Sequence, residues 1–353
     1  MKRNNLRIKK TILCRHINEY DVDSALAKTH YPKAGDIALF EVLEIGRHIA
    51  IQSETKRNVF LVEGDVIMAA YGNRYASGQF EGYVPEKPTE INDIIAIGGV
   101  IGIVKSKHAE LELIEPTKVR LLGYAVDKNK KVLNTKYFAT SKIPFTGTVP
   151  NNARVILSVG STMDSGKTTS AAFLCRGLKT TEKNVAYIKL TGTTYTKDQD
   201  LAYDLGADVT LDFSDAGFPS TYMCTEAELL DLYQTLLGKL EPYNPDYILI
   251  EIADGLVERE TDFLLRSPKF MSTVSNTMMS CGDSLSAFYA VDYLTKLRFP
   301  PTVLAGKFTM SPLLIEEVKA GTSIPVLTID DLMSGRFVDL FTRQEALASK
   351  NGN

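Results

Sequence analysis

The stretch GSTMDSGKTT, residues 160–169, ends like a phosphate-binding loop but begins one residue out of register. The usual pattern, G-x-x-x-x-G-K-[ST], has a glycine where this chain has Ser161, and Gly160 stands directly ahead. Because RVILSVG precedes the stretch and KTTSAAFLCRGLKT follows it, we expect a strand, a turn and a helix. Backbone amides of such a turn, together with the helix N-terminus, attract phosphate. The stretch therefore predicts a phosphate site, and the alternative is an ordinary helix cap.

Several residues of this stretch have an expected role in holding ATP and Mg²⁺. Gly166 lets the backbone approach a phosphate closely, and Lys167 reaches the β- and γ-phosphates as a mobile point charge. The hydroxyl of Thr168 is the expected Mg²⁺ ligand, and Thr169 is a second phosphate contact. The residues expected to bind the nucleotide are Gly160, Ser161, Thr162, Asp164, Ser165, Gly166, Lys167, Thr168 and Thr169.

Acidic residues stand at or just past the ends of other predicted strands. Mg²⁺ bound to nucleotide phosphates needs one or two carboxylates, directly or through water. Glu251 is the first choice because it ends a run of apolar residues, and Asp215, in FSDAGFPSTY, is the second. Asp212 and Asp254 lie in similar places. Each could instead cap a helix or lie in a loop, and for Asp283 we expect the cap.

The second half of the chain alternates apolar strands with amphipathic helices. Such alternation predicts an α/β fold with a mainly parallel sheet covered on both faces, which binds ligands at the carboxyl ends of its strands. The expected strands are RVILSVG, NVAYIKL, ADVTLDF, DYILIEIADGL, TVSNTMMSC, PTVLAG and IPVLTI, with helices over 167–180, 225–240, 257–267 and 284–298 and one more after PTVLAG.

The first half of the chain is rich in short β-forming runs. Alternating or apolar segments such as GDIALFEVLEIG and IIAIGGVIGIVKSK predict a small antiparallel barrel or sandwich over about residues 33–125. We therefore expect a β-rich domain over 1–141 with a basic, solvated arm at Lys2 to Lys10, a linker over 142–153, and a nucleotide-binding α/β domain over 154–353.

Composition and charge exclude several classes of protein. A chain of 353 residues, 44 % hydrophobic and 24 % charged, is typical of a soluble protein with two domains. No apolar run approaches the ~20 residues of a membrane span, and MKRNNLRIKKTIL lacks the pattern of a secretory signal, so we expect a cytoplasmic protein without membrane contact. Residues 1–150 carry a net charge of +5 and residues 151–353 a net charge of −8, an asymmetry too modest for nucleic-acid binding.

Cysteine and histidine usage narrows the chemistry further. Cys14, Cys175, Cys224 and Cys281 form no C-x-x-C pair, which argues against disulfides and zinc and favours buried free thiols. His108 is the last of four histidines, so the second half has no imidazole for general base work.

The spacing G-[ST]-x-x-x-x-G-K-T resembles the loop of dethiobiotin synthetase and its relatives, which are P-loop proteins. In that family a strand ending in lysine follows the loop, and a later strand ends in E-G-A-G-G. This chain has YIKLTGT with Lys189 and LIEIADGL with Glu251 in the same order. It departs from the family at Ile252 and Asp254, where glycines are expected, and at Thr162, where an aspartate is expected. The whole chain is also similar to two-domain P-loop proteins labelled MobB-like, which share phrases such as YGNRYASGQFEG and EIADGL.

The resemblance implies an ATP-dependent ligase or kinase. It implies that Lys167, Lys189 and Glu251 act on a small, carboxylate-bearing acceptor. The expected role of Lys189 is to neutralise charge on the transferring phosphoryl group or on the acceptor. Alternatively, the side chain of Lys189 only reaches from the strand end into solvent. The resemblance also implies a homodimer. Two other functions stay open: a regulatory module in which nucleotide orders the loops TGTTYTKD and FSDAGFPSTY, and an acyltransferase whose loop holds the phosphates of coenzyme A.

The segment YGNRYASGQFEGY is the most unusual part of the first half, because it mixes three glycines with four aromatic residues and Arg74. Arg74 could grip an anion, or the segment could be a loop that packs domains or subunits together.

Overall fold

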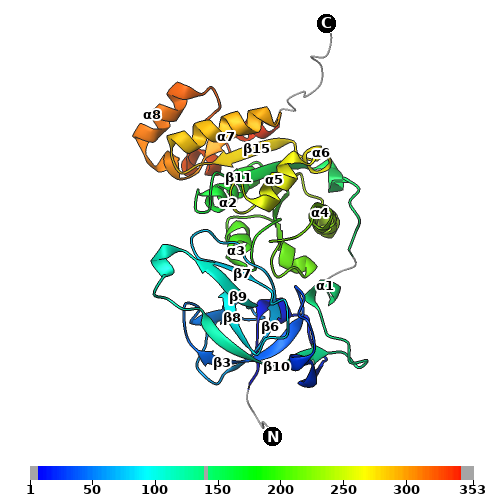
Figure 1. The fold of residues 1–353 in the computed structure, drawn as a ribbon. Helices are drawn as coiled ribbons and strands as arrows, with labels where there is room; N and C mark the ends of the chain where they lie inside the picture. Colours follow the sequence, from blue (N-terminus) through cyan, green and yellow to red (C-terminus); the bar gives the residue numbers. More distant parts are fainter. Residues whose placement is uncertain (1–6, 139–141, 343–353) are drawn as a thin grey trace. The chain divides into compact units, whose positions relative to one another are not determined.

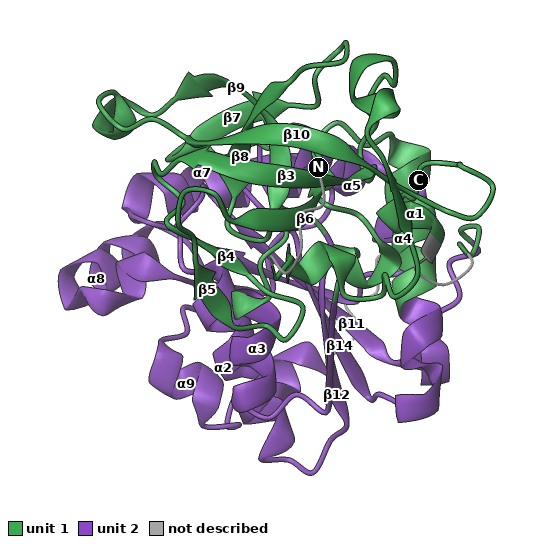
Figure 2. Ribbon diagram, turned by 90° about the horizontal axis from the view of Figure 1, so that it is seen from below, with its two compact units in different colours: residues 1–145, 191–197, 212–236 green, residues 146–190, 198–211, 237–353 purple. Residues whose placement is uncertain are grey.

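A computed structural model describes residues 7–138 and 142–342 (Figure 1). Backbone contacts divide the chain into two compact units (Figure 2). Unit 1 comprises Met1–Phe145, Thr191–Lys197 and Asp212–Leu236, and unit 2 comprises Thr146–Leu190, Asp198–Leu211 and Leu237–Asn353. Parts of the expected domains, namely residues 1–6 of the basic arm, 139–141 and 343–353, lie outside the described residues.

Unit 1 is built on a mixed sheet of eight strands. Strand β6 bonds to both β3 and β9, so β6, β3, β10, β8 and β9 close into a ring. The sheet is not purely antiparallel as expected, since β1 and β6, and β6 and β9, run parallel. The strands are β1 (Lys9–Lys10), β2 (Asp21–Asp23), β3 (Ile37–Glu44), β6 (Val66–Tyr71), β7 (Phe80–Tyr83), β8 (Ile91–Ala96), β9 (Val100–Lys107) and β10 (Thr117–Val126); β4 (Ala50–Gln52) and β5 (Asn58–Phe60) form a separate pair.

The ring of unit 1 encloses apolar side chains. Phe40 from β3, Tyr71 from β6 and Tyr124 from β10 are fully buried and belong to one core cluster. Outside the strands, unit 1 contains the short helices η1 (Ile12–Cys14), η2 (Ala25–Lys28), η3 (Ala109–Leu111), α1 (Thr135–Phe138) and η5 (Phe213–Ala216).

The end of the basic arm is structured rather than solvated. Lys9 and Lys10 form β1 beside β6, and the Lys9 ammonium pairs with the carboxylate of Asp65. The Lys10 ammonium donates to the carbonyl of Ile17 at 2.7 Å. The expectation of a free arm is therefore wrong for these two lysines, because the edge of β6 offers backbone partners that a basic sequence alone does not reveal.

Unit 2 contains the sheet that carries the loop. Its strand order is β13-β12-β14-β11-β15-β16. The pairs β12 and β14, β14 and β11, β11 and β15, and β15 and β16 run parallel, which confirms the expected mainly parallel sheet. The strands are β11 (Arg154–Gly160), β12 (Val185–Lys189), β13 (Val209–Asp212), β14 (Tyr247–Glu251), β15 (Asn276–Ser280) and β16 (Val303–Ala305).

The helices of the second half follow the predicted alternation with some differences. No helix was predicted over Lys197–Asp204, Pro268–Met271 or Ile329–Met333, and IPVLTI forms only an isolated bridge between Leu304 and Val326. The helices are α2 (Lys167–Lys179), α3 (Lys197–Asp204), α4 (Glu226–Leu240), α5 (Arg259–Arg266), α6 (Pro268–Met271), α7 (Ser284–Lys296), α8 (Pro312–Gly321) and α9 (Ile329–Met333), with short 3₁₀ helices η4 (Pro150–Asn152), η6 (Glu241–Tyr243), η7 (Lys307–Met310) and η8 (Val338–Phe341).

Helix α2 ties the loop to the core of unit 2. It packs on β11, β12, β14, β15 and α9. Leu174 and Leu178 of α2 are buried in one cluster with Leu249 of β14 and Met278 of β15. The start of α2, where the loop ends, is therefore fixed relative to the carboxyl ends of four strands.

None of the helices within residues 7–138 and 142–342 is long and apolar enough to cross a membrane. The four cysteines are free and buried, as expected from their spacing.

Candidate functional site

The loop between β11 and α2 has the backbone of a phosphate cradle. Gly166 has a φ of 95°, a left-handed conformation that side chains disfavour, and Asp164 has a φ of 61°. Lys167, the first residue of α2, is only 6 % exposed, and Ser165 is also buried. Thr162, Asp164 and Thr169 are exposed. The amides at the start of α2 therefore stand where an anion would be stabilised.

The one-residue shift in the motif has a steric reason. A side chain at Gly160 would collide with Ser165 Oγ, and its Cβ would lie 3.0 Å from Cδ of Lys167. The crowded position of this loop is thus Gly160, at the end of β11, while Ser161 occupies the place of the usual glycine.

Neighbouring segments brace the loop from the side of β15 and β16. The amide of Ser161 donates to the carbonyl of Ser280 at 2.9 Å, and the amide of Lys307 donates to the carbonyl of Ser165 at 3.0 Å. Gly166 packs close to Gly306, since a Cβ on Gly166 would lie 3.1 Å from its Cα. These contacts hold both ends of the loop before any ligand binds.

Thr168 and Glu251 meet at the carboxyl edge of the sheet. Thr168 Oγ1 donates to one carboxylate oxygen of Glu251 at 2.8 Å, and the Tyr187 hydroxyl donates to the other at 2.7 Å. Glu251 is fully buried, and burial raises the pKa of its carboxyl, while Lys189 and Lys167 oppose that rise. The structure thus brings together the two residues predicted as metal ligands first, and adds Tyr187, which the sequence analysis did not consider.

Lys189 ends β12 next to this group. Its ammonium pairs with the carboxylate of Asp198 in α3, and the amide of Leu190 donates to the backbone carbonyl of Glu251 at 2.9 Å. The side chain of Lys189 is only 12 % exposed, so it does not simply extend into solvent.

Asp215 has structural partners in unit 1. One of its carboxylate oxygens accepts from the amide of Asp212 at 2.8 Å in a capping box, and the other accepts from Arg15 at 2.8 Å. The role in metal binding predicted for Asp215 therefore stays a prediction, since the observed contacts are those of the cap and an ion pair. Asp283 caps α7, as expected, with its carboxylate accepting from the amide of Ser286 at 2.7 Å.

Three buried hydroxyls in or beside the loop have no hydrogen-bond partner among the residues that the structure describes. They are Oγ of Ser161, Ser165 and Ser280. Buried polar groups are normally paired, so unpaired ones at a phosphate loop are groups that a ligand can satisfy. Ser280 was missed from the sequence because only the pairing of β11 with β15 brings it beside the loop.

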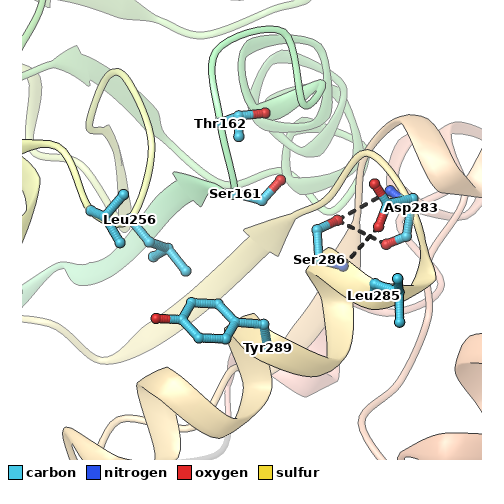
Figure 3. A pocket seen from close by; sticks show the side chains of 8 residues that line it. Ser161, Thr162, Leu256, Asp283, Leu285, Ser286 and Tyr289 are labelled. Carbon is cyan, nitrogen blue, oxygen red and sulfur yellow. Dashed lines mark hydrogen bonds between the residues drawn. The ribbon is translucent and has the colours of Figure 1, made fainter.

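A cavity of about 460 Å³ opens where the loop begins (Figure 3). Ser161 and Thr162 form its loop wall, and residues after β14 and from the start of α7 form the rest. A space of this size is within the range of small-molecule sites.

The absence of a side chain at Gly255 leaves space for the backbone of the loop. A Cβ on Gly255 would lie 2.8 Å from the carbonyl oxygen of Ser161 and 3.0 Å from the Cα of Thr162. We expect Gly255→Ala to displace the loop and to lower the ATP-dependent turnover that the resemblance to dethiobiotin synthetase implies by about 10- to 100-fold, since small misplacements of reacting groups cost that much. Gly282→Ala, whose Cβ would meet no atom within 4 Å, is the matched control. Steady-state kinetics that give equal losses for the two variants would contradict this role.

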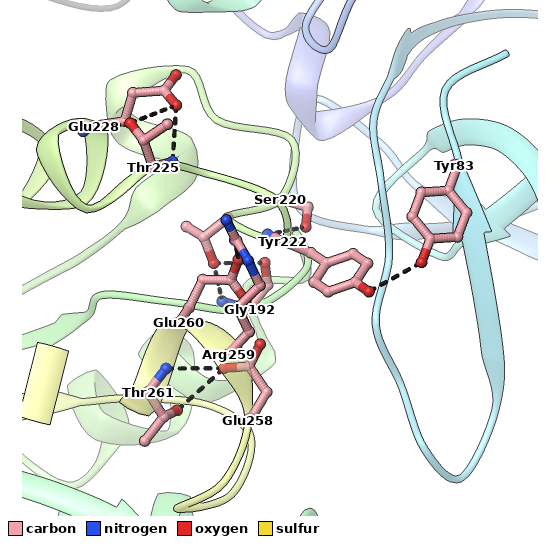
Figure 4. A network of polar contacts seen from close by, with 11 residues as sticks. Tyr83, Gly192, Ser220, Tyr222, Thr225, Glu228, Glu258, Arg259, Glu260 and Thr261 are labelled. Atoms are coloured by element: carbon pink, nitrogen blue, oxygen red, sulfur yellow. Dashed lines mark hydrogen bonds and ion pairs between the residues drawn. The ribbon is translucent and has the colours of Figure 1, made fainter. Parts of the chain in front are cut away.

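Arg74 organises its own loop in unit 1. Its guanidinium donates to the carbonyl of Ile95 and to the side chain of Gln79, and the residue is only 8 % exposed. These contacts favour the interpretation of residues 71–83 as a packing loop over binding of an anion by Arg74. In the same unit the hydroxyls of Tyr83 and Tyr222 lie 3.0 Å apart (Figure 4).

A buried carboxyl at the start of α5 makes the free energy of unfolding depend on pH. The carboxylate of Glu258 accepts from the amide of Thr261 at 3.0 Å (Figure 4), and burial together with the Glu260 carboxyl raises the pKa of Glu258 to about 9. A raised pKa means that the folded state holds the proton more tightly than the unfolded state. The free energy of unfolding then falls as pH rises from about 4.5 towards 9, by at most about 1.4 kcal/mol per pH unit.

Glu258→Gln should remove this part of the pH dependence and stabilise the protein at pH 8 relative to the natural chain. Urea unfolding at pH 5.5, 7 and 8.5 measures the slope, with Glu317→Gln, at an exposed position of α8, as the control. An unchanged slope in Glu258→Gln would show that Glu258 does not carry it.

The residues at the loop fit a magnesium ion that is bound through nucleotide phosphates. Within residues 7–138 and 142–342 no cluster of three or more His, Cys, Asp or Glu side chains could hold a metal by itself. Thr168 and Glu251 nevertheless offer a hydroxyl and a carboxylate oxygen, the hard ligands that Mg²⁺ takes when phosphates and waters supply the others.

No protein-family model matches the sequence, and no curated protein sequence matches it. Among solved structures, it is similar to a nucleotide-binding protein from Archaeoglobus fulgidus in complex with ADP, with 12 % identity over 55 % of this chain and 93 % of that chain and a TM-score of 0.36. It is also similar to a ParA family ATPase from Chlorobium tepidum, with 14 % identity over 53 % of this chain and 92 % of that chain and a TM-score of 0.33. A third similar structure is the signal recognition particle 54 kDa protein from Aeropyrum pernix in complex with GDP. It has 15 % identity over 59 % of this chain and 50 % of that chain, with a TM-score of 0.38. Likenesses this distant carry no information about activity.

The class of the second half follows from its own geometry. A glycine-lysine-threonine loop joins a buried parallel strand to a helix, and the helix's first threonine contacts the glutamate that ends the adjacent strand. This arrangement is that of a P-loop between a parallel strand and a helix of an α/β domain, which offers a site for phosphate.

Proposed function

We propose that unit 2 binds Mg·ATP at the loop and transfers the γ-phosphoryl group to the carboxylate of a small acceptor. The observation that carries the proposal is the hydrogen bond of 2.8 Å between Thr168 Oγ1 and the carboxylate of Glu251. It supports a role in magnesium binding for these two side chains, which adjoin Lys167 at the start of the helix. The carboxylate-bearing acceptor in this proposal comes from the resemblance to dethiobiotin synthetase.

In the proposed step an oxygen of the acceptor carboxylate attacks the γ-phosphorus. The bond from that phosphorus to the oxygen bridging the β- and γ-phosphates breaks, and the products are ADP and an acyl phosphate. No proton has to move, because a carboxylic acid is ionised at neutral pH, which suits a P-loop half without histidine.

The chain's part in this step is positioning and charge stabilisation. Lys167 would contact the β- and γ-phosphates, and Lys189, which pairs with Asp198, would add a second positive charge at the end of β12. Thr168 and Glu251 would hold Mg²⁺, which would neutralise phosphate charge.

Trapping with hydroxylamine tests the proposal, because it converts acyl phosphates to stable hydroxamates. The protein is incubated with Mg·ATP and, one at a time, acetate, succinate, octanoate or phenylpropionate. We expect hydroxamate from at least one acid, only when ATP and Mg²⁺ are both present. ADP formation that is indifferent to every acid, with no hydroxamate, would contradict phosphoryl transfer to a carboxylate.

A nucleotide-dependent switch is the second candidate, and one observation favours it. The segments that leave the carboxyl ends of β12 and β13, Thr191–Lys197 and Asp212–Leu236, belong to unit 1 although their strands belong to the sheet of unit 2. Within unit 1 the amide of Thr194 donates to the carbonyl of Pro219 at 3.1 Å. A rearrangement at those strand ends would therefore reach unit 1 through the chain itself. Acid-independent, slow ATP turnover with changed amide exchange in both segments would favour this candidate.

A further inference from the structure

We propose that the cavity beside the start of the loop is the acceptor site and that it selects monocarboxylic acids with an apolar body. This inference rests on the proposed function and names its substrate class. The cavity meets the loop at Ser161 and Thr162, whereas Lys167, which would hold the phosphates, starts the helix at the loop's far end. A ligand in the cavity would contact the same loop that would hold the phosphates, which is the proximity that transfer needs.

The walls of the cavity favour an apolar occupant. Leu256, Leu285 and Tyr289 line it (Figure 3), as does Val257. The side chains of Val257, Leu285 and Tyr289 are 72 %, 78 % and 54 % exposed. Large apolar side chains gathered around a hollow gain free energy when a ligand covers them, at about 25 cal/mol for each Å² removed from water. Ligand sites typically combine such walls with a few placed polar groups.

Charge sets the number of carboxylates that the cavity accepts. Among the described residues that line it, Asp283 is the only charged one, and it is itself an acid. A second carboxylate in the body of the acceptor would find no cation there and would be repelled by Asp283. The single reacting carboxylate is therefore directed to the loop wall, where the buried Oγ of Ser161 has no hydrogen-bond partner and can donate to it.

The position of the cavity disfavours the nucleotide's base as its occupant. The end of the loop that carries Lys167 is braced by Gly306 and Lys307, which follow β16, and neither of these lines the cavity. A nucleotide whose phosphates lie at the start of α2 therefore has its own neighbours on the side of β16. Binding of the base in the cavity is an outcome that the experiment distinguishes.

Two variants with the same substitution and nearly the same exposure test the assignment. Leu285→Asp places a carboxylate in the cavity wall, and Leu313→Asp places one on α8 outside the cavity; the two leucines are 78 % and 77 % exposed. Calorimetric titrations with octanoate, phenylpropionate, acetate and succinate, in the presence of Mg²⁺ and a non-hydrolysable ATP analogue, measure acceptor affinity. Acid-stimulated ADP release is the second readout.

We expect octanoate or phenylpropionate to bind and to stimulate ADP release, and acetate and succinate to do so at least about tenfold less well. Leu285→Asp should weaken binding of the apolar acids by about tenfold or more, which is the loss expected for one apolar side chain in contact. Leu313→Asp should leave acid binding unchanged, and both variants should bind the ATP analogue like the natural chain.

The outcomes separate this inference from the proposed function. Preference for acetate or succinate, or equal effects of the two variants, would overturn the acceptor site and leave phosphoryl transfer standing. Loss of affinity for the ATP analogue in Leu285→Asp alone would assign the cavity to the base and also overturn the inference. No binding of the analogue to the natural chain would overturn the proposed function, and the acceptor site with it.

Discussion

Replacing Lys167 by alanine will weaken binding of Mg·ATP by about 100-fold and lower turnover further, to near the background rate. Lys167 is 6 % exposed at the first position of α2, so its ammonium is held inside the loop rather than in solvent. A hydrogen bond to a charged group contributes about 1.5–3 kcal/mol, and each 1.4 kcal/mol is tenfold in affinity. Removing a group that stabilises the transferring phosphoryl costs about a further 10²- to 10³-fold in rate.

Isothermal titration with ATP measures the first effect and ADP release the second. Lys183→Ala, which removes a charge at an exposed position between α2 and β12, is the matched control and should behave like the natural chain. Equal ATP affinity in Lys167→Ala and the natural chain would contradict the assignment of the loop as a phosphate site.

Replacing Glu251 by glutamine should abolish the dependence of ATP binding on Mg²⁺, lower turnover about 100-fold or more, and yet stabilise the fold at neutral pH. The first two effects follow because an amide is a poorer ligand for a hard cation than a carboxylate is. The third follows from burial, which raises the pKa of the Glu251 carboxyl. Glutamine has the same shape and can still bond to both Thr168 and Tyr187.

The sign of the pH effect can be checked directly. Because the folded pKa of Glu251 lies above the ordinary value of 4.5, its contribution to the free energy of unfolding falls as pH rises through and above that value. Thermal unfolding should therefore show Glu251→Gln as the more stable protein at pH 8, with the difference vanishing below about pH 4.5. Glu316→Gln, at an exposed position of α8, should change neither stability nor turnover. A destabilised Glu251→Gln at pH 8 would mean that the ionised carboxylate holds the fold together.

Much of unit 2 could be predicted from its sequence because the relevant patterns are local. Apolar runs that end at Gly160, Lys189 and Glu251 predicted β11, β12 and β14, and the glycine-lysine-threonine sequence predicted the turn into α2. Parallel strands bring their carboxyl ends to one edge, which is why Thr168 and Glu251 could be paired without a structure.

The rest depends on pairings across the chain that no local pattern encodes. Tyr187 reaches the Glu251 carboxylate only because β12 and β14 are neighbours in register, and Ser280 reaches the loop only through β15. Gly255 matters because its missing side chain leaves space for Ser161, a contact that sequence spacing does not reveal. Asp215 was selected by its place after a strand, but that place equally suits a cap.

The closed ring in unit 1 illustrates the same limit. Alternating apolar residues predicted β-strands, but the parallel pairing of β6 with β9 depends on which edges meet. The pairing of Lys9 and Lys10 with β6 likewise required the position of its free edge.

Calorimetric titration of the natural chain with ATP, GTP and acetyl-coenzyme A, each with and without Mg²⁺, tests the central claim most directly. The claim predicts that one ATP binds per chain, with an affinity that Mg²⁺ strengthens. Tight binding of acetyl-coenzyme A with no heat from ATP in either condition would contradict it and assign the loop to the phosphates of coenzyme A instead.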